Sequence, residues 1–392
     1  MSAQMDLISV GFSAVLALGI GLYAVSVPQG GRAWWGLATV IVALVITGEL
    51  AGDSLARTIA LDLAELAGVA LVWSHATKEA TAAARAYLYS ILPAIACTLI
   101  AFASMAAVGG NRPAPAVESL VVCLVIVGFA LKLGLIPFYF WLPAVAAAAA
   151  PMTTALIVSV VDIATFAELA AIRQLSPWVF TEHTAVWMAV AVISMFGGAL
   201  LALAQTELKR MLAFSTIADL GFLLLGLIAG GSGLPGAWIG ALSHALSKVI
   251  LFGAVGLAEA RIGRTVTLDT SGLGARLPLA SAAFIVGALS FIGIPPGFGF
   301  GGYWRIYVAA SQFGGPALIA ILLAAAALDL LCYARAIHRT WLGPAQIALT
   351  GPRISFLAPG VLTLLAVAAI LLGCYPSVLT RAIVASPLAM AR

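Results

Sequence analysis

The chain has 392 residues, of which 63% are hydrophobic and only 9% are charged. Soluble domains carry about 25% charged residues, so this composition excludes a water-soluble enzyme and indicates an integral membrane protein. The formal net charge is +4, and the basic residues lie mostly between apolar segments. That distribution is typical of topology signals in membrane proteins and argues against nucleic-acid binding.

A succession of apolar stretches runs along the whole chain, with glycine, proline or charge between them. Because a membrane-spanning helix needs about 20 such residues, the sequence predicts an all-α integral membrane protein with about 12–14 transmembrane helices. The expected spans lie near residues 5–26, 33–52, 56–74, 84–107, 117–136, 153–173, 184–205, 211–230, 236–257, 278–294, 300–312, 316–336 and 355–375. The first span lacks a basic n-region and a clear cleavage site, so we expect a retained helix and not a signal peptide.

Two segments carry helix breakers inside otherwise apolar sequence. Gly134 and Pro137 follow Lys132, and the run IGIPPGFGFGG at 292–302 has paired prolines that cannot continue a helix. Non-helical backbone at membrane depth persists only where it is buried in protein or lines water. Broken helices beside intramembrane charge are typical of transporters, although an ordinary loop is the alternative at 292–302. The short run at 139–152 is expected to link two helices at the membrane surface or to dip into it.

Ionisable residues recur inside the apolar stretches. They are Asp62, Glu65, Lys132, Asp162, Glu168, Asp219, His244, Lys248, Arg305 and Asp329. Asp62 and Glu65 are one helical turn apart, and His244 and Lys248 are four residues apart, so each pair shares a helix face. A single buried charge can belong to a structural ion pair. A row of them on several spans favours proton movement, since glutamate, lysine, histidine and water exchange protons when neighbouring charges tune their pKa values.

The sequence lacks the motifs of nucleotide binding, nucleophilic catalysis and metal binding. The chain contains no nucleotide-binding loop, zinc-protease pattern, nucleophile elbow or paired-cysteine motif. The four cysteines lack the spacing of metal ligands; they are Cys97, Cys123, Cys332 and Cys374. The sequence therefore predicts no catalytic site, no cofactor and no metal in this chain.

Several blocks resemble the proton-pumping, antiporter-like subunits of respiratory complex I, of multisubunit cation/proton antiporters and of membrane-bound hydrogenases. LKLGLIPFYFWLPAVAAAAAP is similar to the family's lysine-bearing broken helix and its Phe-His-x-Trp-Leu-Pro signature. LALAQTELKRMLAFSTIADLGFLLLGL resembles the acidic-x-Lys-Arg turn and the helix after it, and LSHALSKVILFGAVG resembles the His-x-x-x-Lys helix. SFIGIPPGFGF resembles the second broken helix. The resemblance covers the region from about residue 55 to about residue 345.

The resemblance implies an antiporter-like, inverted-repeat fold with two broken helices, shortened at its N-terminus. Transmembrane helices at 1–54 would precede a single proton-translocation core at 55–392. Glu65 and Lys132 would form a gating pair. The implied proton pathway consists of Glu65, Lys132, Asp162, Asp219, His244 and Lys248. Tyr303 aligns with the family's terminal lysine or glutamate, and Arg305 is either part of the outlet or a fixed charge, because arginine does not release its proton.

Besides Tyr303 at the terminal position, the chain departs from the family pattern at three positions. Asp162 stands where the family has a central lysine, Asp219 replaces a histidine, and Tyr139 replaces the histidine of the Phe-His-x-Trp signature. Aspartate can still relay a proton by alternating between neutral and anionic forms, whereas lysine alternates between cationic and neutral forms. These exchanges predict a pathway whose second half differs from that of the family.

The resemblance implies a proton-translocating subunit of a redox-driven complex I-like or hydrogenase-like assembly, a translocase subunit without an active site of its own. Redox cofactors are expected in partner subunits. The partners would be other membrane and peripheral subunits, in a bacterial cytoplasmic (inner) membrane or an equivalent energy-coupling membrane. Two alternatives are a subunit of a sodium/proton antiporter complex, in which Asp162 and Asp219 would supply hard oxygen ligands, and a non-conducting structural scaffold.

Overall fold

The computed structural model describes residues 3–107, 112–344 and 348–377. Within these ranges the chain is helical, with one isolated β-bridge between Glu207 and Thr267. The first helices are α1 (Ala3–Ser26), α2 (Arg32–Leu50), α3 (Ser54–Trp73), α4 (Lys78–Ala107), α5 (Pro115–Lys132), α6 (Trp141–Ala148), α7 (Pro151–Leu156), the π-helical segment η1 (Ile157–Val161) and α8 (Asp162–Leu175). The later ones are α9 (Trp178–Thr181), α10 (Thr184–Ala204), α11 (Leu208–Ala229), α12 (Gly233–Ile262), α13 (Leu273–Arg276), α14 (Pro278–Ile292), α15 (Gly299–Phe313), α16 (Gly315–Ala336), η2 (Ile337–Trp341) and α17 (Leu357–Cys374).

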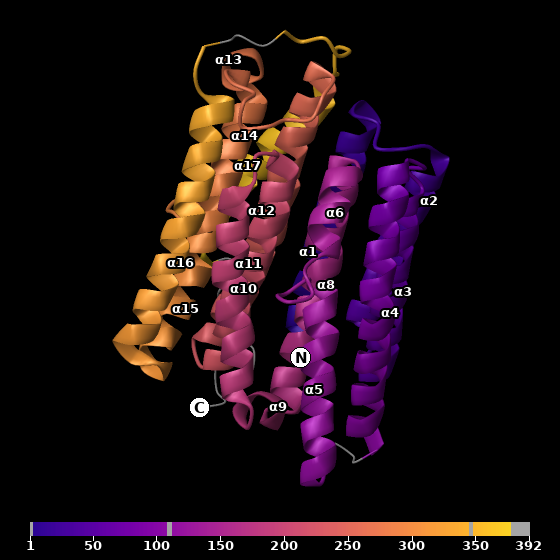
Figure 1. The fold of residues 1–392 in the computed structure, drawn as a ribbon, viewed down its shortest axis with the longest axis vertical. Helices are drawn as coiled ribbons and strands as arrows, with labels where there is room; N and C mark the ends of the chain where they lie inside the picture. Colours follow the sequence, from indigo (N-terminus) through magenta and orange to yellow (C-terminus); the bar gives the residue numbers. More distant parts are fainter. Residues whose placement is uncertain (1–2, 108–111, 345–347, 378–392) are drawn as a thin grey trace.

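The long helices lie side by side in one bundle, with α13 at one end and α9 at the other (Figure 1). Among the described residues, ten segments are long and apolar enough to cross a membrane. Three further helices add to these: α3 has 20 residues but carries Arg57, Asp62 and Glu65, and α14 and α15 have 15 residues each. With them the number reaches the predicted range, and the predicted all-α membrane fold is confirmed.

The first broken helix consists of α5 and α6. Helix α5 ends at Lys132, Gly134 adopts a φ of +61°, and the Ile136–Pro137 peptide bond is cis. A positive φ is readily adopted only by glycine. Trp141 in α6 donates its Nε1 hydrogen to the carbonyl of Leu131 at 3.0 Å. The run at 139–152 therefore forms the second half of a broken helix inside the bundle, and its Trp141 side chain satisfies the Leu131 carbonyl freed at the break.

The second broken helix repeats this construction at 292–302. Helix α14 ends at Ile292, Gly293 adopts a φ of +79°, and the Pro295–Pro296 bond is cis. The hydroxyl oxygen of Tyr303 in α15 lies 2.8 Å from the carbonyl oxygen of Phe291. In both breaks, an aromatic side chain of the following helix thus binds a carbonyl freed at the end of the preceding one. The alternative of an ordinary loop at 292–302 was wrong.

The two broken helices run in opposite directions through the bundle. Helix α5 lies below α6, whereas α14 lies above α15 (Figure 1). A continuous helix of 30 residues packs against both halves of each: α4 against α5 and α6, and α12 against α14 and α15. Each broken helix is followed by a long segment that contains a π-helical turn. This repeated order in opposite directions is the inverted-repeat arrangement implied by the sequence resemblance.

Candidate functional site

Lys132 lies at the end of α5, among three carboxylates. Its Nζ donates a hydrogen bond of 2.5 Å to Oδ1 of Asp62 and lies 3.8 Å from Oε1 of Glu65 and 3.6 Å from Oε2 of Glu168. The lysine side chain is 0% exposed and those of the carboxylates are at most 5% exposed. Asp62 and Glu65 come from one face of α3, and Glu168 comes from α8. Glu65 therefore belongs to the Lys132 cluster, but Asp62 is the nearest partner.

Two threonine hydroxyls orient the carboxylates of this cluster. Thr58 donates to Oε1 of Glu168 at 2.5 Å, and Thr165 donates to Oε1 of Glu65 at 3.3 Å. With every group ionised, one positive charge would face three negative charges in a buried site. An uncompensated buried charge is strongly unfavourable, so the Lys132 cluster is suited to sharing additional protons among its carboxylates.

Asp162 lies between the two halves of the bundle. It is the first residue of α8, directly after the π-helical segment η1, and is 5% exposed. Its carboxylate interacts electrostatically with Glu65 on one side and with Lys248 on the other. The η1 segment packs against both α3 and α12, and π-helical turns of this kind are frequent at functional sites. Asp162 is thus the charged group between the Lys132 cluster and the second half of the bundle.

Asp219 in α11 is held by two donors from the second half. His244 Nδ1 lies 2.6 Å from Oδ2 of Asp219. The Tyr303 hydroxyl donates to Oδ1 and shares its one hydrogen between this oxygen and the Phe291 carbonyl. All three are buried, with exposed fractions of 4% for Asp219, 2% for His244 and 6% for Tyr303. The imidazole also interacts with the main chain at Val158 in η1. Tyr303, which the sequence predicted near the outlet, is a direct partner of Asp219.

Lys248 lies one turn from His244 on α12 and is 0% exposed. Its Nζ donates to the carbonyl of Leu212 and to the hydroxyl of Ser215, each at 2.8 Å, and lies 3.9 Å from the ring centroid of Phe291. Ser215 in turn shares a hydrogen bond of 2.8 Å with Tyr333. Lys248 is therefore bound by neutral groups, and its charge is balanced from a greater distance by carboxylates such as Asp162 and Asp219.

Unlike Tyr303, Arg305 has a partly exposed side chain that bonds within its own helix. Its guanidinium donates to the carbonyl of Gly301 at 2.6 Å, one turn back on the same helix, and the side chain is partly exposed. Ser232 donates to the Arg305 carbonyl. This local bonding suits a fixed charge. In the described part of the chain, no group of three or more His, Cys, Asp or Glu side chains is arranged to hold a metal ion.

Two members of the Lys132 cluster are absent from the pathway inferred from the sequence. Asp62 had a sequence signal, because it precedes Glu65 by one helical turn, and it makes the shortest contact with Lys132. The sequence signal for Glu168 was weaker. It shares a helix with Asp162, but this position alone does not reveal that α8 brings Glu168 close to Lys132. Asp329 in α16 has one carboxylate oxygen, Oδ1, that is buried without a hydrogen bond within the described residues.

The structure has two oppositely directed broken helices and a buried row of ionisable side chains between them. Together these features place the chain in a class of polytopic membrane proteins with inverted repeats. A comparison with protein families agrees: the family described as NADH:quinone oxidoreductase/Mrp antiporter, TM matches residues 59–328. The chain belongs to this family, and the resemblance noted in its sequence is confirmed.

Relatives in this family are longer than the matched part of the chain. NADH-quinone oxidoreductase subunit N of Desulforudis audaxviator (strain MP104C) is 31% identical over 313 residues, which cover 74% of this chain and 61% of that protein. The subunit N of Salinibacter ruber (strain DSM 13855 / M31) is 34% identical over 268 residues, covering 64% of this chain and 53% of that protein. The chain thus spans about half the length of the curated relatives it matches.

Solved structures share the fold over almost the whole chain. A chain of the Mrp complex from Dietzia sp. DQ12-45-1b matches with a TM-score of 0.89 and 22% identity, covering 98% of this chain and 84% of that one. A chain of respiratory complex I from Thermus thermophilus with bound NADH matches with a TM-score of 0.87 and 20% identity, covering 99% and 84%. At these identities the likeness shows a common fold.

Proposed function

We propose that the protein is a proton-translocating membrane subunit of a redox-driven, complex I-like or hydrogenase-like assembly. The observation that carries this proposal is the row of buried ionisable groups that runs from the Lys132 cluster through Asp162 to Lys248 and on to Asp219. Buried charges of this kind are unfavourable in a membrane and mark proton and ion pathways. The relatives named NADH-quinone oxidoreductase subunit N support the redox-driven version of the proposal.

The geometry suggests how each group acts. Lys132 keeps its proton while Asp62, Glu65 and Glu168 are ionised around it, and it can release the proton when one of them is neutralised. Asp162 exchanges protons between the two halves by alternating between neutral and anionic forms. In the second half, Lys248 exchanges protons through Ser215, and His244 shares a proton with Asp219. Each step changes the charge beside the next group, so the row acts as an electrostatic relay.

The assembly would supply what this chain does not carry. Redox cofactors would reside in partner subunits, and electron transfer there would reach the Lys132 cluster as a change in the electric field or in helix packing. The chain would work among other membrane and peripheral subunits, in a bacterial cytoplasmic membrane or an equivalent energy-coupling membrane. It would be one subunit of a translocase and would have no active site of its own.

The two alternatives receive less support. For sodium/proton exchange, Asp219 would need free oxygen atoms, yet both of its oxygens are engaged by His244 and Tyr303. A non-conducting scaffold would need no titratable group between the halves, whereas Asp162 lies there in a buried position. Sodium dependence of transport would favour the exchanger.

The Lys132→Ala variant tests the proposal in the assembled complex. Lys78, an exposed residue at the start of α4, supplies the matched control Lys78→Ala. We expect the Lys132→Ala complex to assemble and to lose proton transport, measured with a pH-sensitive dye in vesicles, while the control keeps the wild-type rate. Failed assembly without a separable transport defect would support a scaffold. An assembled variant that transports protons normally would contradict the proposal.

A further inference from the structure

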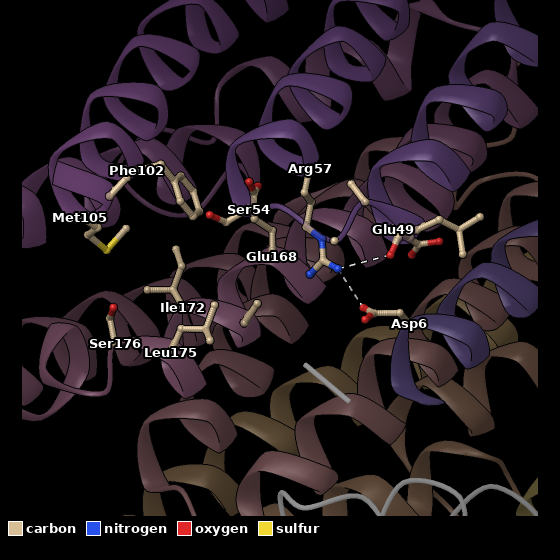
Figure 2. A pocket seen from close by; sticks show the side chains of 15 residues that line it. Asp6, Glu49, Ser54, Arg57, Phe102, Met105, Glu168, Ile172, Leu175 and Ser176 are labelled. Carbon is tan, nitrogen blue, oxygen red and sulfur yellow. Dashed lines mark hydrogen bonds and ion pairs between the residues drawn. The ribbon is translucent and has the colours of Figure 1, made fainter. Parts of the chain in front are cut away.

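A cavity of about 650 Å³ lies among the ends of α1, α2, α3, α4 and α8 (Figure 2). Its polar wall contains Asp6, Glu49, Ser54, Arg57 and Glu168, and its apolar wall contains Phe102, Met105, Ile172 and Leu175. The volume is enough for a group of water molecules, and charged groups in its wall offer them hydrogen-bond partners. The cavity is therefore suited to hold water at the edge of the bundle.

The polar wall is organised around Arg57. Its Nη2 lies 3.0 Å from Oδ1 of Asp6 and donates to the carbonyl of Glu49 at 3.3 Å, as the dashed lines in Figure 2 mark. The Glu49 side chain accepts a hydrogen bond from Ser9 through Oε1. Its Oε2 is buried and has no hydrogen-bond partner in the described part of the chain. A buried carboxylate oxygen without a protein donor, in the wall of a cavity, points to water as its partner.

Glu168 belongs both to this cavity and to the Lys132 cluster. It lies about two turns before the end of α8, deeper in the bundle than Leu175, which also lines the cavity. Its Oε1 accepts the hydrogen bond from Thr58, and its Oε2 lies 3.6 Å from the Lys132 Nζ. The side chain is 1% exposed. Glu168 is thus one carboxylate between a cavity and the lysine at the centre of the proposed pathway.

The distribution of basic residues indicates which side of the membrane the cavity faces. Figure 1 shows α13 at one end of the bundle. By their places along the elements, the basic residues at the helix ends and loops on that side are Arg32, Lys78, Lys209, Arg210, Arg261, Arg264, Arg276, Arg339 and Arg353. Within residues 3–107, 112–344 and 348–377, the helix ends and loops at the opposite end carry Arg57, Arg112 and Arg173. Cytoplasmic loops carry the excess of lysine and arginine, so the α13 end faces the cytoplasm. The cavity lies at the helix ends away from α13.

We infer that this cavity is an aqueous route between the non-cytoplasmic side and the Lys132 cluster, and that Glu168 passes protons between them. In the outward direction, the neutral Glu168 carboxyl gives its proton to a cavity water, which leaves a carboxylate and a hydronium ion. While Asp62 or Glu65 is neutral, the carboxylate then takes a proton from the Lys132 ammonium, which becomes a neutral amine until Asp162 or a neighbouring carboxyl reprotonates it. This inference rests on the proposed function, and it places an outlet in the first half of the bundle.

Proton transport by the assembled complex in vesicles, read with a pH-sensitive dye, tests the role of Glu168. The Glu168→Gln variant keeps the size of the side chain and an acceptor for Thr58 but cannot carry a proton. We expect its transport to fall by about 100-fold, the effect of a lost proton-transfer group, and Glu168→Asp to restore much of the rate. Transport at the wild-type rate in Glu168→Gln would overturn the inference.

A second pair of variants tests the cavity without touching the charged cluster. Ala106 is exposed and lines the cavity, and Ala107, the next residue, is exposed and lies outside the lining. We expect Ala106→Trp to fill the cavity and slow transport severalfold, while Ala107→Trp keeps the wild-type rate. Equal rates in the two variants would overturn the inference, and this comparison decides the matter even if Glu168→Gln fails to assemble.

Thiol labelling tests the side to which the cavity opens. In a chain whose four native cysteines are replaced, Ala106→Cys should react with a membrane-impermeant thiol reagent in intact cells. Thr265→Cys, exposed at the α13 end, should react only in inverted vesicles. The reverse pattern would overturn the outward assignment. If Lys132→Ala abolishes transport and the cavity variants do not alter it, the inference fails and the proposed function stands; if Lys132→Ala transports normally, the proposed function itself fails.

Discussion

Replacing Lys132 with methionine removes the ammonium that Asp62, Glu65 and Glu168 share. At an effective dielectric constant of about 20, the Coulomb attraction of Nζ is about 7 kcal/mol for the Asp62 oxygen at 2.5 Å and about 4–5 kcal/mol for each oxygen at 3.6 and 3.8 Å. Desolvation offsets most of this attraction. Since removing one partner of a buried pair costs about 3–5 kcal/mol, we expect Lys132→Met to lower the free energy of unfolding by that amount.

Asp62→Asn provides the contrast, because it removes one negative charge from a cluster that has too many. The asparagine Oδ1 can still accept the hydrogen bond from Lys132, and the repulsion of Glu65 and Glu168 is relieved. We therefore expect its free energy of unfolding to stay within about 1 kcal/mol of the wild type. Adding Asp62→Asn to Lys132→Met should recover part of the lost stability, because fewer uncompensated carboxylates remain.

The order of stability among the wild type, Asp62→Asn and Lys132→Met can be measured on the purified complex in detergent. The readout is the fraction of the complex that stays monodisperse after heating. Lys132→Met should lower the midpoint clearly, and Asp62→Asn should leave it close to the wild type. If Asp62→Asn destabilises the complex as much as Lys132→Met does, the cluster is a simple ion pair between Asp62 and Lys132. That result would refute the description of the site as a proton-sharing cluster with excess negative charge.

Two further predictions concern the second half of the bundle and the α13 end. Tyr303→Phe removes the hydroxyl that lies within hydrogen-bond distance of Asp219 and of the Phe291 carbonyl. The free energy of unfolding should therefore fall by about 1–3 kcal/mol, and proton transport should slow. Tyr307→Phe is the matched control, and equal stability and transport in the two variants would contradict the role of Tyr303. His75, in the loop after α3, has its pKa lowered from 6.5 by burial and then by Lys209. Because the unfolded chain takes up that proton more readily, stability is full above pH 6.5 and falls as the pH drops below it. The unfolding midpoint of the wild type should therefore decrease between about pH 7.5 and about pH 5.5 more than that of His75→Gln, and identical slopes would count against a partly buried, neutral His75.

Most long helices of this protein could be predicted from sequence because they are apolar runs of sufficient length between breakers. Both broken helices also had a local signal, since Gly134 and Gly293 stand beside prolines that interrupt a helix. The run at 139–152 had none that revealed its depth, because the bond from Trp141 to the Leu131 carbonyl forms only in the folded chain. The π-helical segment at 157–161 lies in apolar sequence broken only by Ser159, where nothing distinguishes it from an α-helix.

The candidate site was predictable in composition but not in pairing. Spacing places Asp62 and Glu65 on one face of α3, yet which of them approaches Lys132 more closely depends on the relative depth of α3 and α5. Glu168 joins the same cluster through the packing of α8, which is a tertiary contact without a local signature. In the second half, the replacement of a histidine by Asp219 is visible in the sequence, whereas its two donors, His244 and Tyr303, come from different helices.

The most direct test of the central claim is proton transport by the Asp162→Asn variant of the assembled complex. Asparagine has nearly the size of aspartate, so assembly should be retained, but the carrier between the Lys132 cluster and Lys248 is lost. With a pH-sensitive dye in vesicles and electron transfer measured in the same preparation, we expect proton transport to be lost. An assembled Asp162→Asn complex that transports protons at the wild-type rate would contradict a pathway through this row of residues.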